Sequence, residues 1–95
     1  MAYIHDCDLN RIDASTLFGE EAEKLLEACR QVCRQVLYPS NDYNKENYSR
    51  QFRVIYGIAR RHHIRLDWDG RDKYTCMPDR WEIYKNGKHI GRINV

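Results

Sequence analysis

Cysteine and histidine supply the nucleophiles, bases and soft metal ligands that this chain has available for chemistry. The cysteines stand at positions 7, 29, 33 and 76, and the histidines stand at positions 5, 62, 63 and 89. Zinc sites usually contain close Cys-x-x-Cys or His-x-x-x-His pairs. The chain contains neither spacing, so the sequence predicts no metal site and no cofactor.

The same residues do not form a familiar catalytic arrangement. Cys29 and Cys33 lie four residues apart in a helical segment, where we expect them in the core as inert, reduced thiols. His62 and His63 are adjacent, and neighbouring side chains on a helix point about 100° apart. Because no Ser/His/Asp or Cys/His spacing stands out, the sequence predicts a protein without enzymatic activity.

An acidic run over residues 67–72 raises the question of a calcium site. An EF-hand loop that began at Asp67 would need an oxygen ligand at Arg71, glycine at Asp72 and glutamate at Pro78. None of these three requirements is met. The run is therefore interpreted as a polar turn.

Basic residues gather in the second half of the chain. Residues 1–46 carry nine acidic and five basic side chains, whereas residues 47–95 carry five acidic and eleven basic ones. Arginine and tyrosine are enriched in binding hot spots, and basic side chains beside rings also suit phosphates and bases. We therefore expect a surface that binds a partner or nucleic acid, made of Arg53, Arg60, Arg61, Arg65, Tyr84, Lys85, Lys88 and Arg92.

The elements that must position these residues begin with a strong helical pattern. Apolar residues recur at helical spacing over residues 20–37, glutamates occupy the first turn, and Pro39 ends the segment. We expect a shorter helix over residues 13–18, capped by Asp13 and ended by Gly19. Residues 3–5 suit an edge strand, and residues 39–47 suit an exposed loop.

Residues 48–63 fit either a helix or a strand. As a helix, Phe52, Ile55 and Tyr56 share one face with apolar neighbours, whereas in a strand Ile55 falls on the polar side. The helix is favoured despite a cost of about 1 kcal/mol for Gly57 in its interior.

The strand alternative carries a resemblance. If residues 51–58 formed a strand, Phe52-Arg53-Val54-Ile55-Tyr56-Gly57-Ile58 followed by Ile64-Arg65-Leu66 resembles the central hairpin of small bacterial ribonuclease or gyrase-poisoning toxins. The resemblance covers less than a fifth of the chain. It implies a ribonuclease-type toxin as one alternative function.

From residue 64 onward, apolar residues recur at every second position instead of at helical spacing. Residues 64–68 are expected to form a half-buried strand, followed by a loop that reaches Asp72 and a second strand over residues 74–77. The longer loop is preferred because a two-residue turn would place Asp67 opposite Asp72, and like charges facing across strands are destabilising.

The last hairpin is the best-defined β feature of the sequence. Asn86-Gly87 suits a type I′ turn between strands over residues 81–85 and 88–95. In this register Ile93 shares the face of Ile83 only if Gly91 forms a β-bulge, so we expect a bulge there. The predicted cross-strand pairs are Tyr84–His89, Ile83–Ile90 and Trp81–Arg92.

Together these elements predict a single α+β domain over residues 1–95. Two helices within residues 13–63 pack on a three- to four-stranded antiparallel sheet within residues 64–95, which ends in the C-terminal β-hairpin. No segment has the length and apolar character of a membrane span or the layout of a signal peptide, which predicts a cytoplasmic protein.

The expected function is that of a small non-catalytic interaction protein. Its partner would be a larger protein or nucleoprotein complex, whose functional surface it occludes, with no membrane and no small-molecule cofactor involved. Chains of this size and charge pattern are typical of phage or mobile-element proteins that inhibit a host system such as defence. Direct nucleic-acid binding through the basic half is the main alternative, and a ribonuclease-type toxin is a further one.

Overall fold

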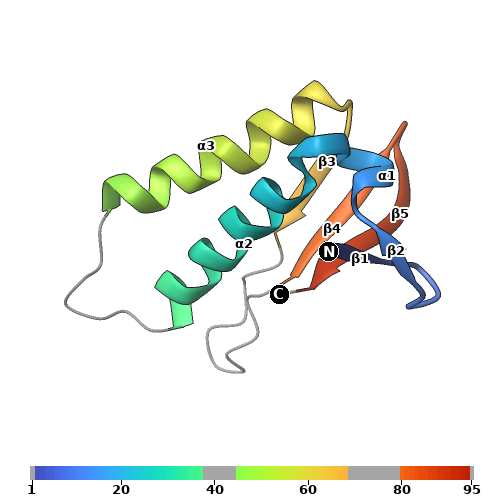
Figure 1. The fold of residues 1–95 in the computed structure, drawn as a ribbon, viewed down its shortest axis with the longest axis horizontal. Helices are drawn as coiled ribbons and strands as arrows, with labels where there is room; N and C mark the ends of the chain where they lie inside the picture. Colours follow the sequence, from blue (N-terminus) through green and yellow to red (C-terminus); the bar gives the residue numbers. More distant parts are fainter. Residues whose placement is uncertain (1, 38–44, 69–79, 95) are drawn as a thin grey trace.

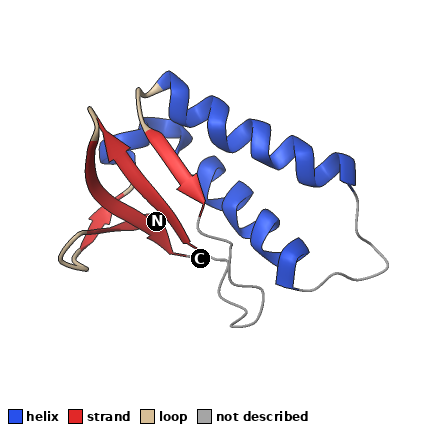
Figure 2. Cartoon of the chain, turned by 180° about the vertical axis from the view of Figure 1, so that it is seen from behind, coloured by secondary structure: helices blue, strands red, loops and turns tan. Residues whose placement is uncertain are grey.

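The computed structural model describes residues 2–37, 45–68 and 80–94 of the chain. These residues form two layers, with two long helices side by side on one face of an antiparallel sheet (Figures 1 and 2). The α+β class and the C-terminal hairpin are therefore as predicted.

The described part of the sheet has five strands, ordered β2-β1-β5-β4-β3, rather than three or four. In chain order, the elements are β1 (Tyr3–Asp6), β2 (Arg11–Asp13), α1 (Ser15–Phe18), a 3-10 turn η1 (Gly19–Glu21), α2 (Ala22–Leu37), α3 (Lys45–Arg61), β3 (Arg65–Trp68), β4 (Arg80–Lys85) and β5 (Lys88–Asn94).

The additional strands come from the N-terminal residues. Residues 3–5 were expected at a sheet edge, but β1 lies between β2 and β5 and pairs with both. The strand β2 has only three residues, too few for an alternating pattern to be recognised in the sequence. The prediction contained too few strands because β1 and β2 are too short and too polar to show an alternating apolar pattern.

The two long helices follow from the apolar spacing of the sequence. Residues 45–61 are helical, which confirms the helix and rules out the strand on which the toxin resemblance rests. Leu25 and Cys29 of α2 and Ile55 and Ile58 of α3 are fully buried. The expected loop over residues 39–47 overlaps the first turn of α3, and its residues 39–44 lie outside the described part of the chain.

The short helix before α2 is present with a shifted start. The helix α1 follows Ala14, and the Asp13 carboxylate accepts a hydrogen bond from the backbone N–H of Ser15 at 2.9 Å. That bond lowers the pKa of Asp13. Gly19 ends α1 with φ of 58°, a conformation that glycine adopts without steric cost.

The strand β3 pairs with β4 over its whole length, from Arg65–Tyr84 to Trp68–Trp81. The strand predicted over residues 74–77 and the loop to Asp72 lie outside the described residues. Among the described strands, β3 therefore forms one edge of the sheet and β2 the other.

The C-terminal hairpin has the predicted turn. Asn86 and Gly87 have φ values of 54° and 76°, the positive values that a type I′ turn requires. The observed cross-strand pairs are Lys85–Lys88, Tyr84–His89, Ile83–Gly91, Glu82–Arg92, Trp81–Ile93 and Arg80–Asn94.

The bulge lies at Ile90, one residue earlier than predicted. The pairing steps from His89 directly to Gly91 while β4 advances by one residue, so Ile90 is the extra residue of β5. Ile93 consequently returns to the inner face and is fully buried, as the predicted bulge required. For the same reason the predicted pairs Ile83–Ile90 and Trp81–Arg92 are wrong.

Gly91 is needed where β1 and β5 meet. It pairs with Asp6, and a Cβ atom added there would collide with the backbone oxygen of His5. Such a contact with main chain cannot be relieved by a rotamer change. Glycine at this position therefore lets the N-terminal strands join the hairpin.

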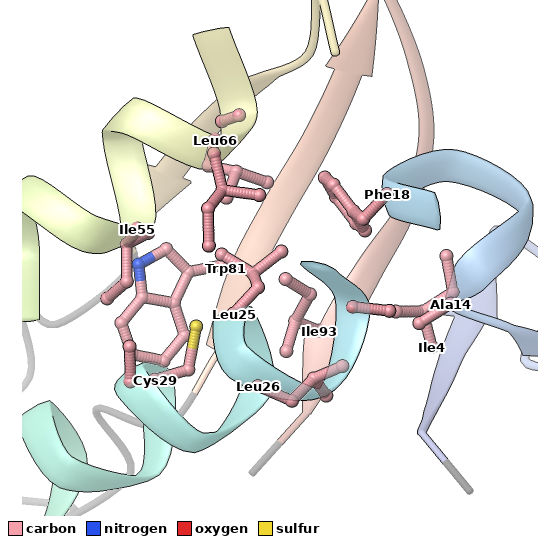
Figure 3. Packing of buried hydrophobic residues seen from close by; sticks show 14 of the residues in the cluster. Ile4, Ala14, Phe18, Leu25, Leu26, Cys29, Ile55, Leu66, Trp81 and Ile93 are labelled. Atoms are coloured by element: carbon pink, nitrogen blue, oxygen red, sulfur yellow. The ribbon is translucent and has the colours of Figure 1, made fainter. Parts of the chain in front are cut away.

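The core lies between the helices and the inner face of the sheet. Trp81 of β4, Cys29 of α2 and Ile55 of α3 belong to one continuous cluster (Figure 3). Burying a large apolar side chain contributes about 1.5–3 kcal/mol, so this cluster is the main source of stability. In the described part of the chain, no helix is long and apolar enough to span a membrane.

Candidate functional site

The face of the sheet opposite the helices carries polar and aromatic side chains, and we call it the outer sheet face. Because side chains alternate along a strand, the partners of the buried residues point away from the core. Figures 1 and 2 show α2 and α3 on the other face. The outer sheet face consists of Tyr3, His5, Arg11, Asp13, Arg65, Asp67, Arg80, Glu82, Tyr84, His89, Arg92 and Asn94.

One row across this face joins three of its strands. Arg65 is opposite Tyr84, and Tyr84 is opposite His89. The Arg65 guanidinium lies 4.3 Å from the centre of the Tyr84 ring, and the Tyr84 and His89 ring centres are 5.2 Å apart. A cation over a ring face is attracted by the ring's quadrupole. The row thus holds an arginine and two rings in fixed positions.

The next row is organised by Glu82, whose side chain is 20% exposed. Its carboxylate lies 2.6 Å from Nε2 of His89, 3.5 Å from Nε of Arg80 and 3.9 Å from Nε of Arg92. Arg92, one of the predicted binding residues, therefore lies within ion-pair distance of Glu82 and shares that carboxylate with Arg80 and His89.

Cys7 completes the contacts of His89. Its Sγ lies 3.6 Å from His89 Nδ1 and 3.5 Å from the His89 backbone oxygen, to which the thiol donates. No local pattern in the sequence indicates this contact, because the two residues are 82 positions apart and meet only through the pairing of β1 with β5. Cys7 is exposed, whereas Cys29 is buried as predicted.

The turn that carries Cys7 is held by Asp6. The Asp6 carboxylate accepts hydrogen bonds from the backbone N–H groups of Asp8 and Asn10, at 2.9 and 2.8 Å. The Asn10 bond is the largest cause that lowers the pKa of Asp6. Leu9 of this turn has φ of 66°, which is rare for a side chain of this kind. The carboxylate thus fixes the backbone that follows the thiol.

A groove of about 570 Å³ lies where α3 leads into β3. Arg60 from α3 and Arg65 from β3 stand on its walls. The described residues that line it include two arginines and no acidic side chain, and the Asp67 carboxylate lies 3.3 Å from the Arg65 guanidinium. The lining residues are Tyr56, Ala59, Arg60, His63, Ile64, Arg65 and Leu66.

Arg53 and the groove residue Tyr56 lie on the same side of α3 as Arg60. They precede Arg60 by seven and four residues, which places the three side chains on one side of the helix. Tyr56 is 38% exposed and stacks on Phe52 with ring centres 5.9 Å apart. We call Arg53, Tyr56, Arg60, Arg65 and Tyr84 the basic–aromatic strip.

Arg61 does not belong to this strip. Its guanidinium donates to both carboxylate oxygens of Glu21, and Nε2 of His62 lies 3.2 Å from the same carboxylate. The Arg61 hydrogen bond lowers the pKa of Glu21 and raises that of Arg61. Arg61 thus ties α3 to η1.

The remaining predicted site residues are Lys85 and Lys88. They pair across the hairpin beside its turn and are exposed there, one residue beyond Tyr84 and His89. The structure thus places Arg60 and Arg65 on one groove, with Tyr84 beside Arg65. Lys85 and Lys88 lie at the hairpin turn, and Arg61 and Arg92 pair with Glu21 and Glu82.

Comparison of the chain with protein-family models, with curated proteins and with solved structures found no match. Within the described residues, no group of three or more His, Cys, Asp or Glu side chains is arranged to hold a metal ion. Any function must therefore be argued from the geometry of the outer sheet face and the groove.

Proposed function

We propose that the protein is a non-catalytic interaction protein that docks on an acidic surface of a larger protein through the basic–aromatic strip. The observation that carries the proposal is the groove with Arg60 and Arg65 on its walls and no acidic side chain among its described lining residues. Complementary charge would steer encounter with an acidic partner and fix its orientation.

The chemistry of the strip suits a protein partner. Arginine and tyrosine are the residue types most often responsible for binding energy, because they offer large rigid surfaces with polar ends. The Tyr84 ring already holds the Arg65 guanidinium at 4.3 Å, so docking would cost little further ordering of this side chain.

The carboxylates of the outer sheet face favour protein over nucleic acid. Asp67 lies 3.3 Å from Arg65, and Glu82 lies within ion-pair distance of Arg80, His89 and Arg92. A phosphate backbone presents one charge sign along its whole length, whereas a protein surface can place basic groups opposite these carboxylates, so they count against nucleic acid more than against a protein. The narrower expectation of a phage or mobile-element inhibitor of a host defence system stays a prediction.

The test is affinity capture with the intact protein and charge-reversed variants, with and without nuclease. Arg60→Glu and Arg65→Glu should each reduce retention of the bound protein about tenfold or more, the effect of losing one hot-spot arginine. Arg30→Glu is the matched control, because Arg30 is exposed on α2 and pairs with Glu27 there.

Retention that is lost on nuclease treatment would assign the strip to nucleic acid instead. If Arg60→Glu and Arg65→Glu retain the same protein as the Arg30→Glu control does, the strip is not the docking surface. Loss of the bound protein in the two strip variants only, unchanged by nuclease, supports the proposal.

A further inference from the structure

We propose that Cys7 is a reactive thiol, with His89 as its base and Glu82 orienting that base, which forms mixed disulfides with small disulfides in solution. This reaction does not depend on the docking function, because it needs only the protein and a disulfide in solution. It rests on three side chains that meet from the β1–β2 turn, β5 and β4.

The geometry is that of a nucleophile, a base and a residue that orients the base. Cys7 Sγ lies 3.6 Å from His89 Nδ1, and His89 Nε2 lies 2.6 Å from Glu82 Oε2. A carboxylate at Nε2 holds the imidazole with its proton on that nitrogen, which leaves Nδ1 free to accept the thiol proton. The protein thus presents a thiol beside a base of fixed orientation.

The fold holds these three groups in place independently of one another. Asp6 fixes the turn that follows Cys7, and Gly91 lets β1 approach β5 closely. The Asn86-Gly87 turn sets His89 opposite Tyr84, so that its ring lies on the outer sheet face. Cys7 is exposed, and the side chains of His89 and Glu82 are 33% and 20% exposed, so a small molecule in solution can reach the sulfur.

The groups around the thiol carry both charge signs. Asp6 and Asp8 flank Cys7 in the chain, and Arg65 covers the ring of Tyr84 that contacts His89. The surroundings of the sulfur therefore do not favour one charge of reagent. The charged or titratable groups near the site are His5, Asp6, Asp8, Arg65, Asp67, Arg80, Glu82, Tyr84 and Arg92.

The reaction is thiol–disulfide exchange. The Cys7 proton passes to His89 Nδ1, and the thiolate attacks one sulfur of the disulfide RS–SR. The new Cys7–SR bond forms as the RS–SR bond breaks, and the electron pair leaves with RS⁻, which takes the proton from His89 to become RSH. Cys7 is oxidised, one sulfur of the reagent is reduced, and no further oxidant is needed.

The experiment follows the rate at which glutathione disulfide modifies each cysteine of the purified protein, measured by mass spectrometry of peptides. An unassisted thiol is only about 3% ionised at pH 7, since its usual pKa is about 8.5. We therefore expect Cys7 to react about tenfold faster at pH 7 than the same turn sequence in a short peptide. Cys29, which is buried, should stay unmodified in the folded protein.

Variants separate a reactive role from a structural one. His89→Gln should reduce the Cys7 rate at pH 7 about tenfold and move the rate increase to alkaline pH, whereas Glu82→Gln should reduce it about threefold. His62→Gln is the matched control, because His62 also pairs with a glutamate but lies at the end of α3. Circular dichroism on every variant shows whether the fold is retained.

A changed pH profile in folded His89→Gln, with the rate of His62→Gln equal to that of the unmodified sequence, supports the proposal. If Cys7 reacts no faster than the peptide, or if folded His89→Gln keeps the original rate and pH profile, the proposal is wrong. Cys7→Ser confirms the assignment by removing the adduct from the peptide that contains residue 7.

Discussion

The two faces of the sheet are built from the same strands but are stabilised by different interactions. The inner face buries Ile4, Leu66, Trp81, Ile83 and Ile93 beneath the helices. The outer face holds its side chains by ion pairs and ring contacts, most of them partly exposed. Apolar burial contributes far more free energy than exposed ion pairs do, so the inner face stabilises the fold and leaves the outer face available for function.

The largest expected effect comes from removing the centre of the inner face. Trp81→Ala should lower the free energy of unfolding by about 3–5 kcal/mol, because it removes a fully buried indole and leaves a cavity. Chemical denaturation followed by circular dichroism measures the change. A Trp81→Ala protein that unfolds at the denaturant concentration of the unmodified sequence would show that the inner face is not the source of stability.

A smaller loss is expected where the N-terminal strands meet the hairpin. Gly91→Ala should lower the free energy of unfolding by about 1–3 kcal/mol, because the methyl group meets the main chain of β1. Gly57→Ala is the matched control, for which the opposite change in the free energy of unfolding is expected. Its added Cβ makes only an ordinary 3.6 Å contact inside α3, so it should stabilise by about 0.5–1 kcal/mol. Thermal unfolding of both variants checks the pair, and equal effects would contradict the close approach of β1 and β5.

Lowering the pH should reduce the stability of the folded protein through carboxylates outside the inner face. Hydrogen bonds and ion pairs lower the pKa values of Asp6, Asp13 and Glu21 in the folded protein below the usual values of 3.8 and 4.5. Their contribution is complete above those usual values and is lost as the pH falls through the lowered ones. Unfolding curves from pH 7 to pH 2 should show this loss, with a smaller acid effect in Glu21→Gln. An unchanged pH dependence in that variant would contradict the role of the Arg61 pair.

The smallest expected change in stability lies on the outer sheet face. Arg65→Ala removes an exposed cation–π contact and should lower the free energy of unfolding by less than about 1 kcal/mol. The same variant should still weaken docking, which separates function from stability. If Arg65→Ala lowered the denaturation midpoint as far as Trp81→Ala does, the outer face would contribute as much to stability as the inner face.

The sequence allowed the inner face to be predicted better than the outer one. The apolar spacing of residues 20–37 and 48–63 predicts both long helices, and Asn86-Gly87 predicts the hairpin, because these signals are local. The burial of Ile93 was predictable once a bulge was allowed. Local patterns therefore determine most of the core.

The contacts of the outer sheet face depend on residues that are far apart in the chain. Cys7 and His89 meet only because β1 pairs with β5, and β2 is too short to show alternation. The turn between β1 and β2 has Leu9 at positive φ, a conformation for which a glycine would be expected in the sequence. The basic cluster was recognised as a group, but the pairing of Arg61 with Glu21 requires the packing of α3 against η1.

The bulge at Ile90 has a consequence for how other chains are compared with this one. After the bulge, the side of the sheet on which a β5 residue lies is shifted by one position relative to an uninterrupted strand. A homologue without the extra residue, aligned without a gap, would match its outward side chains to the inward ones of this chain. Alignments across β5 should therefore be made in two blocks, with an insertion permitted between His89 and Gly91.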